Sequence, residues 1–312
     1  MQRRHFKGTV FSLFLGSLPM ATRKILSPDY ESPFEVIVER FARAFIKQGR
    51  VMDLLYSAGL KSHSLRFPSW IPDWTVLSNG TLYQSSARGV SCSASRRSEP
   101  KASYNDEKKV LEIEGHHVDQ VKSISHYMNV PDYLESYLEE VDQMLEGMPN
   151  ASDLRWRIPI ADASLPEIVS STAIDLRTSY RALRDSFATS SKQTILEQIR
   201  KLSVVSTEAQ PRDEINQPQA TLSRAQNYLN ALQTNLRGWR FLETRNGSFG
   251  IAPNHVQVGD QISIFSGGGV PFLLRNEDPG LLGYRLIGEC YIDGIMKGDA
   301  YRESEVKIIS LY

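Results

Sequence analysis

Apolar side chains recur at helical spacing in the N-terminal and central parts of the chain. Phe34, Ile37, Val38, Phe41 and Phe45 share one helical face, which predicts an amphipathic helix that runs to about residue 48. A shorter helix at residues 51–58 is expected beside it. Similar apolar stripes predict four helices in the centre, at residues 131–145, 174–187, 192–202 and 219–236.

Between and after these helical parts the pattern changes to short apolar or alternating runs, which predict strands. Two of them lie at residues 110–115 and 118–124, and six more are divided by glycine and proline, at residues 239–243, 249–251, 261–265, 270–274, 284–291 and 306–310. Because helices and strands come in separate blocks, we expect an α+β fold. Its β region should be mostly antiparallel and barrel-like, built from residues about 80–127 and 238–310. The helical N-terminal segment and a central helical insertion should pack on it.

Three consecutive glycines, at positions 267–269, separate two of the expected strands. A phosphate-binding P-loop would need Gly-x-x-x-x-Gly-Lys-Ser/Thr followed by a helix. Here no Lys-Ser or Lys-Thr follows, and the next run is extended and apolar. Glycine supplies the positive φ angles of tight turns, so the run predicts the tip of a β-hairpin rather than a nucleotide site.

The overall composition argues against several classes of partner. Thirty-six basic residues balance thirty-six acidic ones, which gives no electrostatic reason to expect binding to nucleic acid or an anionic membrane. Cys92 and Cys290 form no disulfide framework and no Cys-x-x-Cys motif, so we expect a reduced compartment and no metal site. We also expect no cofactor, since no nucleotide-binding motif is found. Residues 10–20 have the outline of a secretory signal peptide. We expect a cytoplasmic protein, with secretion as the alternative.

Few residue patterns indicate catalysis. There is no Gly-x-Ser-x-Gly motif, and His116 and His117 are neighbours in an expected strand, so their rings should face opposite sides and cannot share one metal ion. The charged residues that remain as catalytic candidates are Asp73, Glu289 and Arg285. A buried carboxylate needs a hydrogen-bond partner, so structural pairing with Arg285 or Arg275 is the alternative to catalysis.

The tryptophans are candidate binding residues. Their indole rings would either wall a ligand pocket, with Asp73 or Glu289 as acid or base, or fill the apolar core. The four residues are Trp70, Trp74, Trp156 and Trp239.

Several segments together resemble one protein family. The stretch RFLETRNGSFGIAPNHVQVGDQISIFSGGGVPFLLR starts at Arg240, and GYRLIGECYIDGIMKGDA follows it. Both resemble the C-terminal region of fungal heterokaryon-incompatibility (HET) domain proteins, with mild departures at Ala252, Asp293 and Asp299. Upstream, FPSWIPDW at residues 67–74 is similar to the family's L-P-S-W-V-P-D-W. The RWR of residues 155–157 with Ala161-Asp162 resembles its W-R-T-L-I-A-D.

The resemblance covers nearly the whole chain and implies its organisation. Residues 1–76 correspond to the end of the HET domain, with helices and the Trp-Pro-Asp-Trp segment. Residues 77–312 correspond to a single α+β region with its helical insertion at about 131–236. The family's upstream motifs, such as Y-x-x-L-S-Y-x-W-G, are not found, so the chain resembles the family's C-terminal region without most of the N-terminal HET domain.

The resemblance also implies a function. It indicates a non-enzymatic regulatory or recognition region linked to fungal non-self recognition and programmed cell death. Other HET-pathway proteins would be its partners. In one form of this interpretation, the chain is a truncated paralogue of a longer HET protein. The alternative is an enzyme of a secondary-metabolite pathway that uses a Trp-lined pocket with Asp73 or Glu289 as acid or base. A secreted effector is a third interpretation. The oligomeric state is left open.

Overall fold

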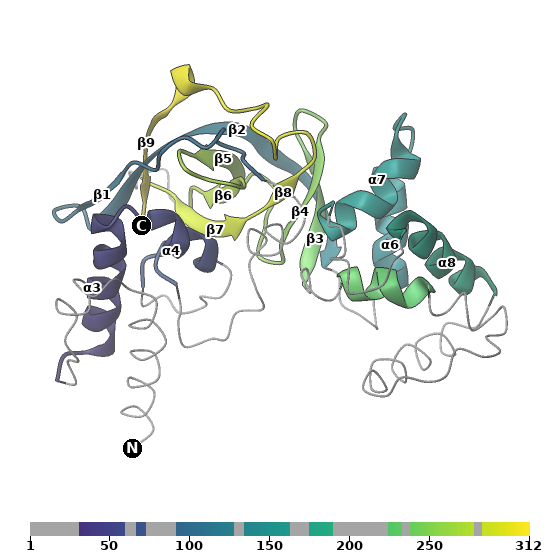
Figure 1. Ribbon diagram of the computed structural model, residues 1–312, viewed down its shortest axis with the longest axis horizontal. Helices are drawn as coiled ribbons and strands as arrows, with labels where there is room; N and C mark the ends of the chain where they lie inside the picture. The colour runs from purple at the N-terminus through teal and green to yellow at the C-terminus, as the bar shows by residue number, and fades with distance from the viewer. Residues whose placement is uncertain are drawn as a thin grey trace.

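The computed structural model of the protein describes residues 31–59, 67–72, 92–127, 134–162, 175–189, 224–232, 238–277 and 283–312. Figure 1 shows two parts: a β part that carries the N-terminal helices α3 and α4, and a group of central helices beside strand β3. The predicted central helix at 192–202, together with Asp73 and Trp74, lies outside the described residues. No helix in the described ranges is long and apolar enough to cross a bilayer.

The helices form where the apolar stripes predict them. The N-terminal pair is α3 (Phe34–Lys47) and α4 (Val51–Ser57), and the centre holds α6 (Leu134–Met144) and α8 (Leu176–Thr189), with a further helical stretch at 224–232. Helix α7 (Ala151–Arg157) and the 3-10 turn η1 (Ile158–Ile160) were not predicted. Since α7 has seven residues and buries only Leu154, it has no apolar stripe to recognise.

The strands form one antiparallel sheet built around a single long strand. That strand is β2 (Val110–Tyr127), and it pairs with β1, β3, β5 and β9. The full pairing order is β7-β6-β5-β2-β3-β4-β8. The other strands are β1 (Ala102–Asn105), β3 (Trp239–Thr244), β4 (Phe249–Pro253), β5 (Gln261–Phe265), β6 (Phe272–Arg275), β7 (Arg285–Glu289), β8 (Tyr291–Ile292) and β9 (Lys307–Leu311).

The sheet curls into a barrel-like form that strand pairing leaves open. β7 pairs with β6 and β8 pairs with β4, and these two end strands are separated in sequence only by Cys290. The ends of the sheet are therefore joined by the chain, and no ladder among the described residues pairs β7 with β8. A single parallel bridge, from Tyr284 to Leu311, links the residue before β7 to β9. One apolar cluster fills the interior, formed by Val121, Leu242, Ala252, Val256, Ile262, Leu273, Ile287, Cys290 and Ile292. The fold is α+β, as the sequence predicts.

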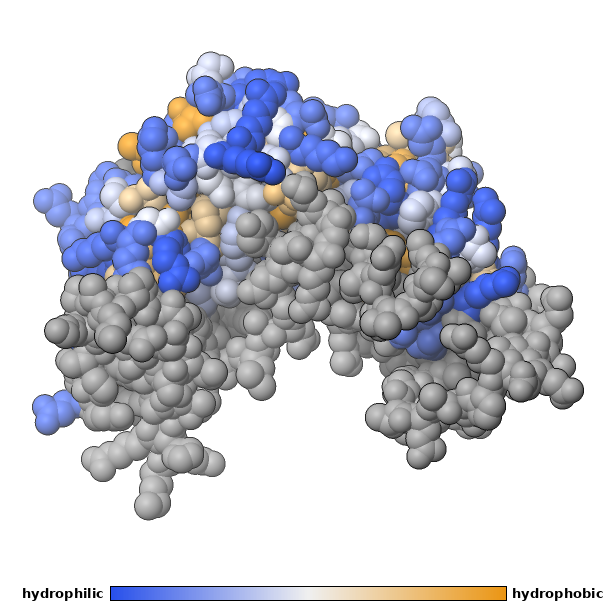
Figure 2. All heavy atoms as spheres, viewed as in Figure 1, coloured by the Kyte–Doolittle hydropathy of each residue, from blue (hydrophilic) through white to orange (hydrophobic). Residues whose placement is uncertain are grey.

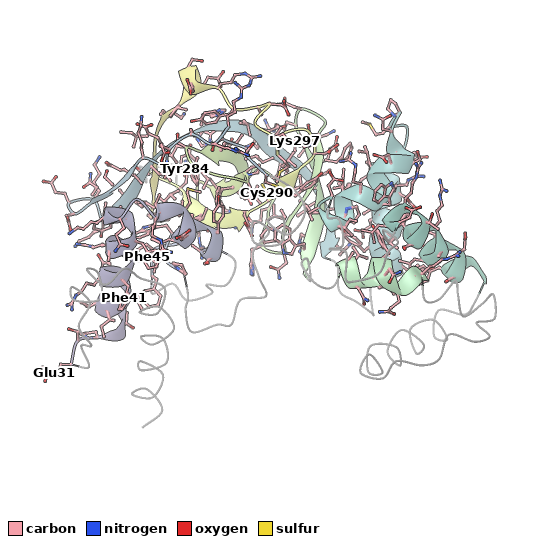
Figure 3. The ribbon with its side chains drawn as sticks, viewed as in Figure 1. Glu31, Phe41, Phe45, Tyr284, Cys290 and Lys297 are labelled. Atoms are coloured by element: carbon pink, nitrogen blue, oxygen red, sulfur yellow. The ribbon has the colours of Figure 1, made fainter. Side chains whose placement is uncertain are left out.

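A second apolar cluster lies between the sheet and the helices. On the N-terminal side, Phe41 and Phe45 of α3 are buried, and Figure 3 shows them along that helix. Tyr56 of α4 stacks on Phe272 of β6 with ring centroids 5.7 Å apart. On the other side, Tyr228 of the 224–232 helix is fully buried and donates a hydrogen bond to the Trp156 carbonyl oxygen (2.7 Å). Burial of one helical face against the sheet explains the amphipathic stripes.

The helical insertion is also tied to the sheet by an ion-pair network at Arg157. The Arg157 guanidinium donates to both carboxylate oxygens of Asp293, at 2.7 and 3.1 Å, and to Asp153 on its own helix at 3.1 Å. The hydrogen bonds to Asp293 raise the pKa of Arg157, and burial raises the pKa of Asp162. Asp293, one of the departures from the family pattern, thus forms a charged contact between the two parts of the fold.

The glycine run is the tip of the β5–β6 hairpin, as predicted. All three glycine amides donate hydrogen bonds: Gly267 to the Ser98 hydroxyl (3.1 Å), Gly268 to the Phe265 carbonyl (2.9 Å) and Gly269 to the Tyr56 hydroxyl (2.7 Å). Residues 94 and 95 close over the turn through backbone hydrogen bonds to Gly269 and Gly268. Because every amide already has an acceptor, the turn has no donor left for a phosphate.

The Gly267→Ala variant is expected to lower the free energy of unfolding by at least about 2 kcal/mol. Gly267 has φ +82°, which an L side chain rarely adopts, and a Cβ added there would lie 2.6 Å from Cβ of Pro100. Gly247→Ala is a matched control, since Gly247 has φ +80° and nothing within 4 Å of the added Cβ. Urea unfolding of both variants measures the difference. Equal losses would contradict the steric contribution from Pro100.

Candidate functional site at one end of the barrel

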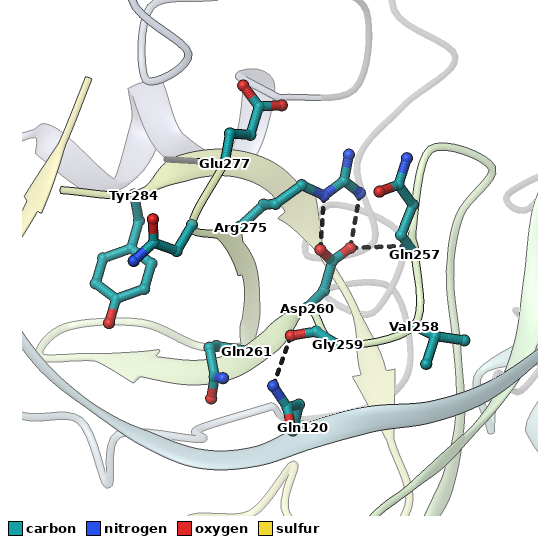
Figure 4. Close-up of a pocket in the computed structure, with 10 residues that line it drawn as sticks. Gln120, Gln257, Val258, Gly259, Asp260, Gln261, Arg275, Glu277 and Tyr284 are labelled. Atoms are coloured by element: carbon teal, nitrogen blue, oxygen red, sulfur yellow. Dashed lines mark hydrogen bonds and ion pairs between the residues drawn. The ribbon is translucent and has the colours of Figure 1, made fainter. Parts of the chain in front are cut away.

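A polar pocket lies at the end of the β5–β6 hairpin opposite the glycine turn (Figure 4). Its volume is about 620 Å³, within the range of roughly 300–1,000 Å³ common for small-molecule sites. β5 begins there, β6 ends there, and β2 and the residue preceding β7 complete the wall. The lining residues are Gln120, Gln257, Val258, Gly259, Asp260, Gln261, Arg275, Asn276, Glu277 and Tyr284.

A buried ion pair forms one side of the pocket. Arg275 Nε donates to Asp260 Oδ1 at 2.7 Å, and Arg275 Nη2 donates to Asp260 Oδ2 at 2.9 Å. The side chain of Asp260 is 2% exposed and that of Arg275 is 17% exposed. Such a bidentate pair fixes the positions of both groups and cancels their charges.

The hairpin register brings this pair together. Gln261 lies opposite Leu274, so the next residue outward on each strand is Asp260 on one and Arg275 on the other. The loop before β5 is held by the same pair, because Arg275 Nη2 donates to the His255 carbonyl (2.7 Å) and the Gln257 amide donates to Asp260 Oδ2 (2.8 Å). The sequence therefore contains a signal for this ion pair, namely two opposite charges at facing positions of a predicted hairpin.

The same loop is anchored to β2. The Val121 amide donates to the Asp260 carbonyl, and the Gly259 amide donates to the Val121 carbonyl, both at 2.9 Å. The Gln120 side-chain amide donates to the Gly259 carbonyl at 2.8 Å. These bonds place the loop as one rigid wall, which is what a preorganised binding site needs.

The charged candidates from the sequence do not assemble into a catalytic group. Arg285 starts β7 and donates to Glu277 Oε1 at 2.9 Å, beside the pocket. Glu289 is at the other end of β7, opposite Phe272, with its side chain fully buried. The neighbouring Cys290 faces the barrel interior, and burial raises the pKa of its thiol well above the usual value. Asp73 lies outside the described residues.

Two of the three described tryptophans belong to the core, and the third packs against it. Trp70 is fully buried and Trp239 is 7% exposed, both in the cluster between sheet and helices. Trp156 is half-buried on α7 and donates from Nε1 to Asp153 Oδ1 at 3.2 Å. None of the three lines the polar pocket. Trp74 lies outside the described residues.

The adjacent histidines contact different neighbours. His116 accepts a hydrogen bond at Nε2 from the Arg302 amide (3.2 Å) and lies against the Tyr301 ring. His117 lies 2.8 Å from the Ser263 hydroxyl through Nδ1, and its ring centroid is 5.0 Å from that of Tyr284 in the pocket wall. Among the described residues, no group of three or more His, Cys, Asp or Glu side chains could hold a metal ion.

The protein is expected to lose stability as the pH falls from about 6.5 to about 4, in part through His117. Burial, with help from Lys307 and His116, lowers the pKa of His117 to about 4, so between these pH values the unfolded chain binds more protons than the folded one. The contribution is complete above pH 6.5 and is lost as the pH falls toward 4. Thermal melts at pH 7.5 and 5.0 measure it. The His117→Asn variant should show a smaller drop, and an equal drop would contradict this assignment.

Comparison with known proteins identifies the protein family of this chain. The family model described as the Het-6 β-barrel domain matches residues 134–308. A curated relative, heterokaryon incompatibility protein 6, OR allele, of Neurospora crassa, is 38% identical over 65 residues, which are 20% of this chain and 10% of that protein. The match thus spans about a tenth of the relative's length. No solved structure matches. Since the family model extends over more than half of the chain, this protein belongs to the heterokaryon-incompatibility (HET) family with a Het-6 β-barrel domain.

Proposed function

We propose that the protein is a non-enzymatic regulatory or recognition region in fungal non-self recognition, linked to programmed cell death. Membership of the HET family and the name of the Neurospora crassa relative, a heterokaryon incompatibility protein, support this proposal. The observation that carries the binding role is the polar pocket, whose charges are neutralised within its own wall and whose loop is preformed.

The enzyme alternative gains no support from the described geometry. Glu289, the acid or base of the enzyme interpretation, has a fully buried side chain. Arg285, the other described catalytic candidate, is paired with Glu277. Trp70 and Trp239 fill apolar space between sheet and helices instead of surrounding a cavity. A binding role does not require Glu289, Arg285 or the tryptophans, because a partner or ligand would contact only the surface and the polar pocket.

Expression in a fungal host tests the regulatory role. The chain is expressed with and without a full-length HET protein, and cell death is scored. A change in death that requires the full-length protein is expected, and co-purification of the two proteins would identify the partner. Death from this chain alone would contradict a regulatory role, and an unchanged score in both backgrounds would contradict any role in the pathway. A destabilised variant with the pocket ion pair removed, Asp260→Ala, shows whether any effect on cell death depends on an intact pocket wall.

We also propose that the protein is cytoplasmic. A fluorescent fusion at the C-terminus is expected to fill the cytoplasm of hyphae. Fluorescence that accumulates in the medium would instead support the secreted alternative, and mass spectrometry of the native N-terminus would then show processing.

A further inference from the structure

The pocket contains hydrogen-bonding side-chain groups that make no hydrogen bond within the part of the chain that the structure describes. The carboxamides of Gln257, Gln261 and Asn276 and the hydroxyl of Tyr284 make no hydrogen bond to any described residue. Figure 4 shows Gln261 and Tyr284 on one side of the pocket and Gln257 beside Arg275 on the other. Gln257 and Asn276 are exposed, and Gln261 and Tyr284 are partly buried, so all four groups can be reached by a ligand in the concave surface.

The fixed charges of the wall do not favour an ion. Asp260 is neutralised by Arg275, and Glu277 is neutralised by Arg285 at 2.9 Å. An anion that approached Arg275 would have to compete with a carboxylate already bound to two of its nitrogens. The ligand that fits is therefore uncharged.

The free groups both donate and accept hydrogen bonds. A carboxamide offers two donors and an acceptor oxygen, and a phenol hydroxyl does both. Sugar hydroxyls have the same double character, and a volume of about 620 Å³ accommodates one or two sugar rings. The ring of Tyr284 is supported by His117 behind it, with centroids 5.0 Å apart, and provides a rigid apolar contact.

An extended peptide is a poorer match. Peptides that add to a sheet need a free strand edge. Here β5 is paired on both sides, with β2 and β6, and β6 is paired with β5 and β7. The wall also has little apolar surface for side-chain anchors, with Val258 as its exposed aliphatic residue.

We propose that this pocket binds a neutral mono- or disaccharide through the side chains of Gln257, Gln261, Asn276 and Tyr284. The Asp260–Arg275 pair holds the loop that carries Gln257 and so positions the wall without contacting the ligand as a charge. This inference rests on the proposed recognition role, because it names the ligand class of the same pocket, but the sugar-binding experiment can fail while the cell-death experiment succeeds.

Ligand-observed saturation-transfer NMR on the full chain tests the proposal with three probes, namely glucose, N-acetylglucosamine and maltose. At least one should give a saturable signal. The Gln261→Ala and Tyr284→Phe variants should each weaken that binding about five- to tenfold, because each removes one or two neutral hydrogen bonds. Gln143→Ala on the exposed face of α6 makes the same chemical change away from the pocket and should leave the affinity unchanged.

Two further probes distinguish the alternatives. Inorganic phosphate and an acetylated, amidated glutamine represent an anion and a peptide. Preferential binding of either one, no saturable signal from the three sugars, or equal sugar affinity in the Gln261→Ala and Gln143→Ala variants would overturn the proposal. Circular dichroism confirms that each variant is folded. If Tyr284→Phe is unstable, Gln261→Ala decides the outcome.

Discussion

The Asp260→Ala variant is expected to lose about 3–5 kcal/mol of unfolding free energy, the usual result of removing one partner of a buried ion pair. Asp260 is 2% exposed and accepts two hydrogen bonds from Arg275 and one from the Gln257 amide. Without it, the guanidinium of Arg275 keeps its charge in a largely buried position, and the loop before β5 loses its central acceptor. Chemical denaturation followed by circular dichroism measures the loss.

Two comparisons make this expectation specific. Asp53→Ala removes the carboxylate of a more exposed pair with Arg50 and should cost less than about 1 kcal/mol. The double variant Asp260→Ala/Arg275→Met should cost less than the sum of the two single variants, because it leaves no charge without a partner. Additive losses would show that the pair contributes no coupling and that Asp260 acts only through the loop amide.

The pattern of apolar residues predicts the helices better than the details of the strands. Residues 110–115 and 118–124 were predicted as separate strands, but β2 is continuous. Its pairing with β5 shifts between His117 and Asp119. Such a bulge changes which side chains face the core, so alternation breaks although the backbone ladder continues. The predicted run 284–291 divides at Cys290 for a related reason, since the chain there changes partners from β6 to β4.

The pocket shows a different limit of sequence analysis. Asp260 and Arg275 are predictable as a pair because a hairpin is a local structure. Gln120 and Tyr284 come from distant parts of the chain, and they meet the hairpin because β2 pairs with β5, β7 pairs with β6, and Tyr284 bridges to β9. Long-range strand order has no local signal in one sequence. The hydropathy of the surface does not mark the pocket either. In Figure 2 the described part of the β region shows mainly hydrophilic residues, with apolar residues in small separate areas.

The Trp70→Ala variant is expected to lose about 3–5 kcal/mol, as is typical when a buried large aromatic side chain is deleted. Trp70 is fully buried, with its ring centroid 5.7 Å from that of Tyr104 on β1. Its segment, residues 67–72, contains no helix or strand and is held by few backbone bonds, such as that of the Ser69 amide to the Tyr312 carbonyl (2.9 Å). The indole attaches this segment to the core together with the buried side chain of Ile71 and the Ser69 hydroxyl, which accepts a hydrogen bond from the Leu286 amide (2.8 Å).

Two variants separate packing from binding as the role of this tryptophan. Trp70 Nε1 is buried without a hydrogen-bond partner among the described residues, so Trp70→Phe removes an unsatisfied donor. Because phenylalanine keeps most of the aromatic volume, the change should cost less than the alanine change. Trp156→Ala removes a half-buried indole and should also cost less. A pocket-wall tryptophan would behave in the opposite way, because its loss would leave thermal stability unchanged and weaken a ligand. A Trp70→Ala protein with unchanged stability would thus contradict the core assignment and restore the Trp-lined site. A severe loss of unfolding free energy in Trp70→Ala, with a much smaller loss in Trp70→Phe, would leave the polar pocket as the binding site in the described part of the chain.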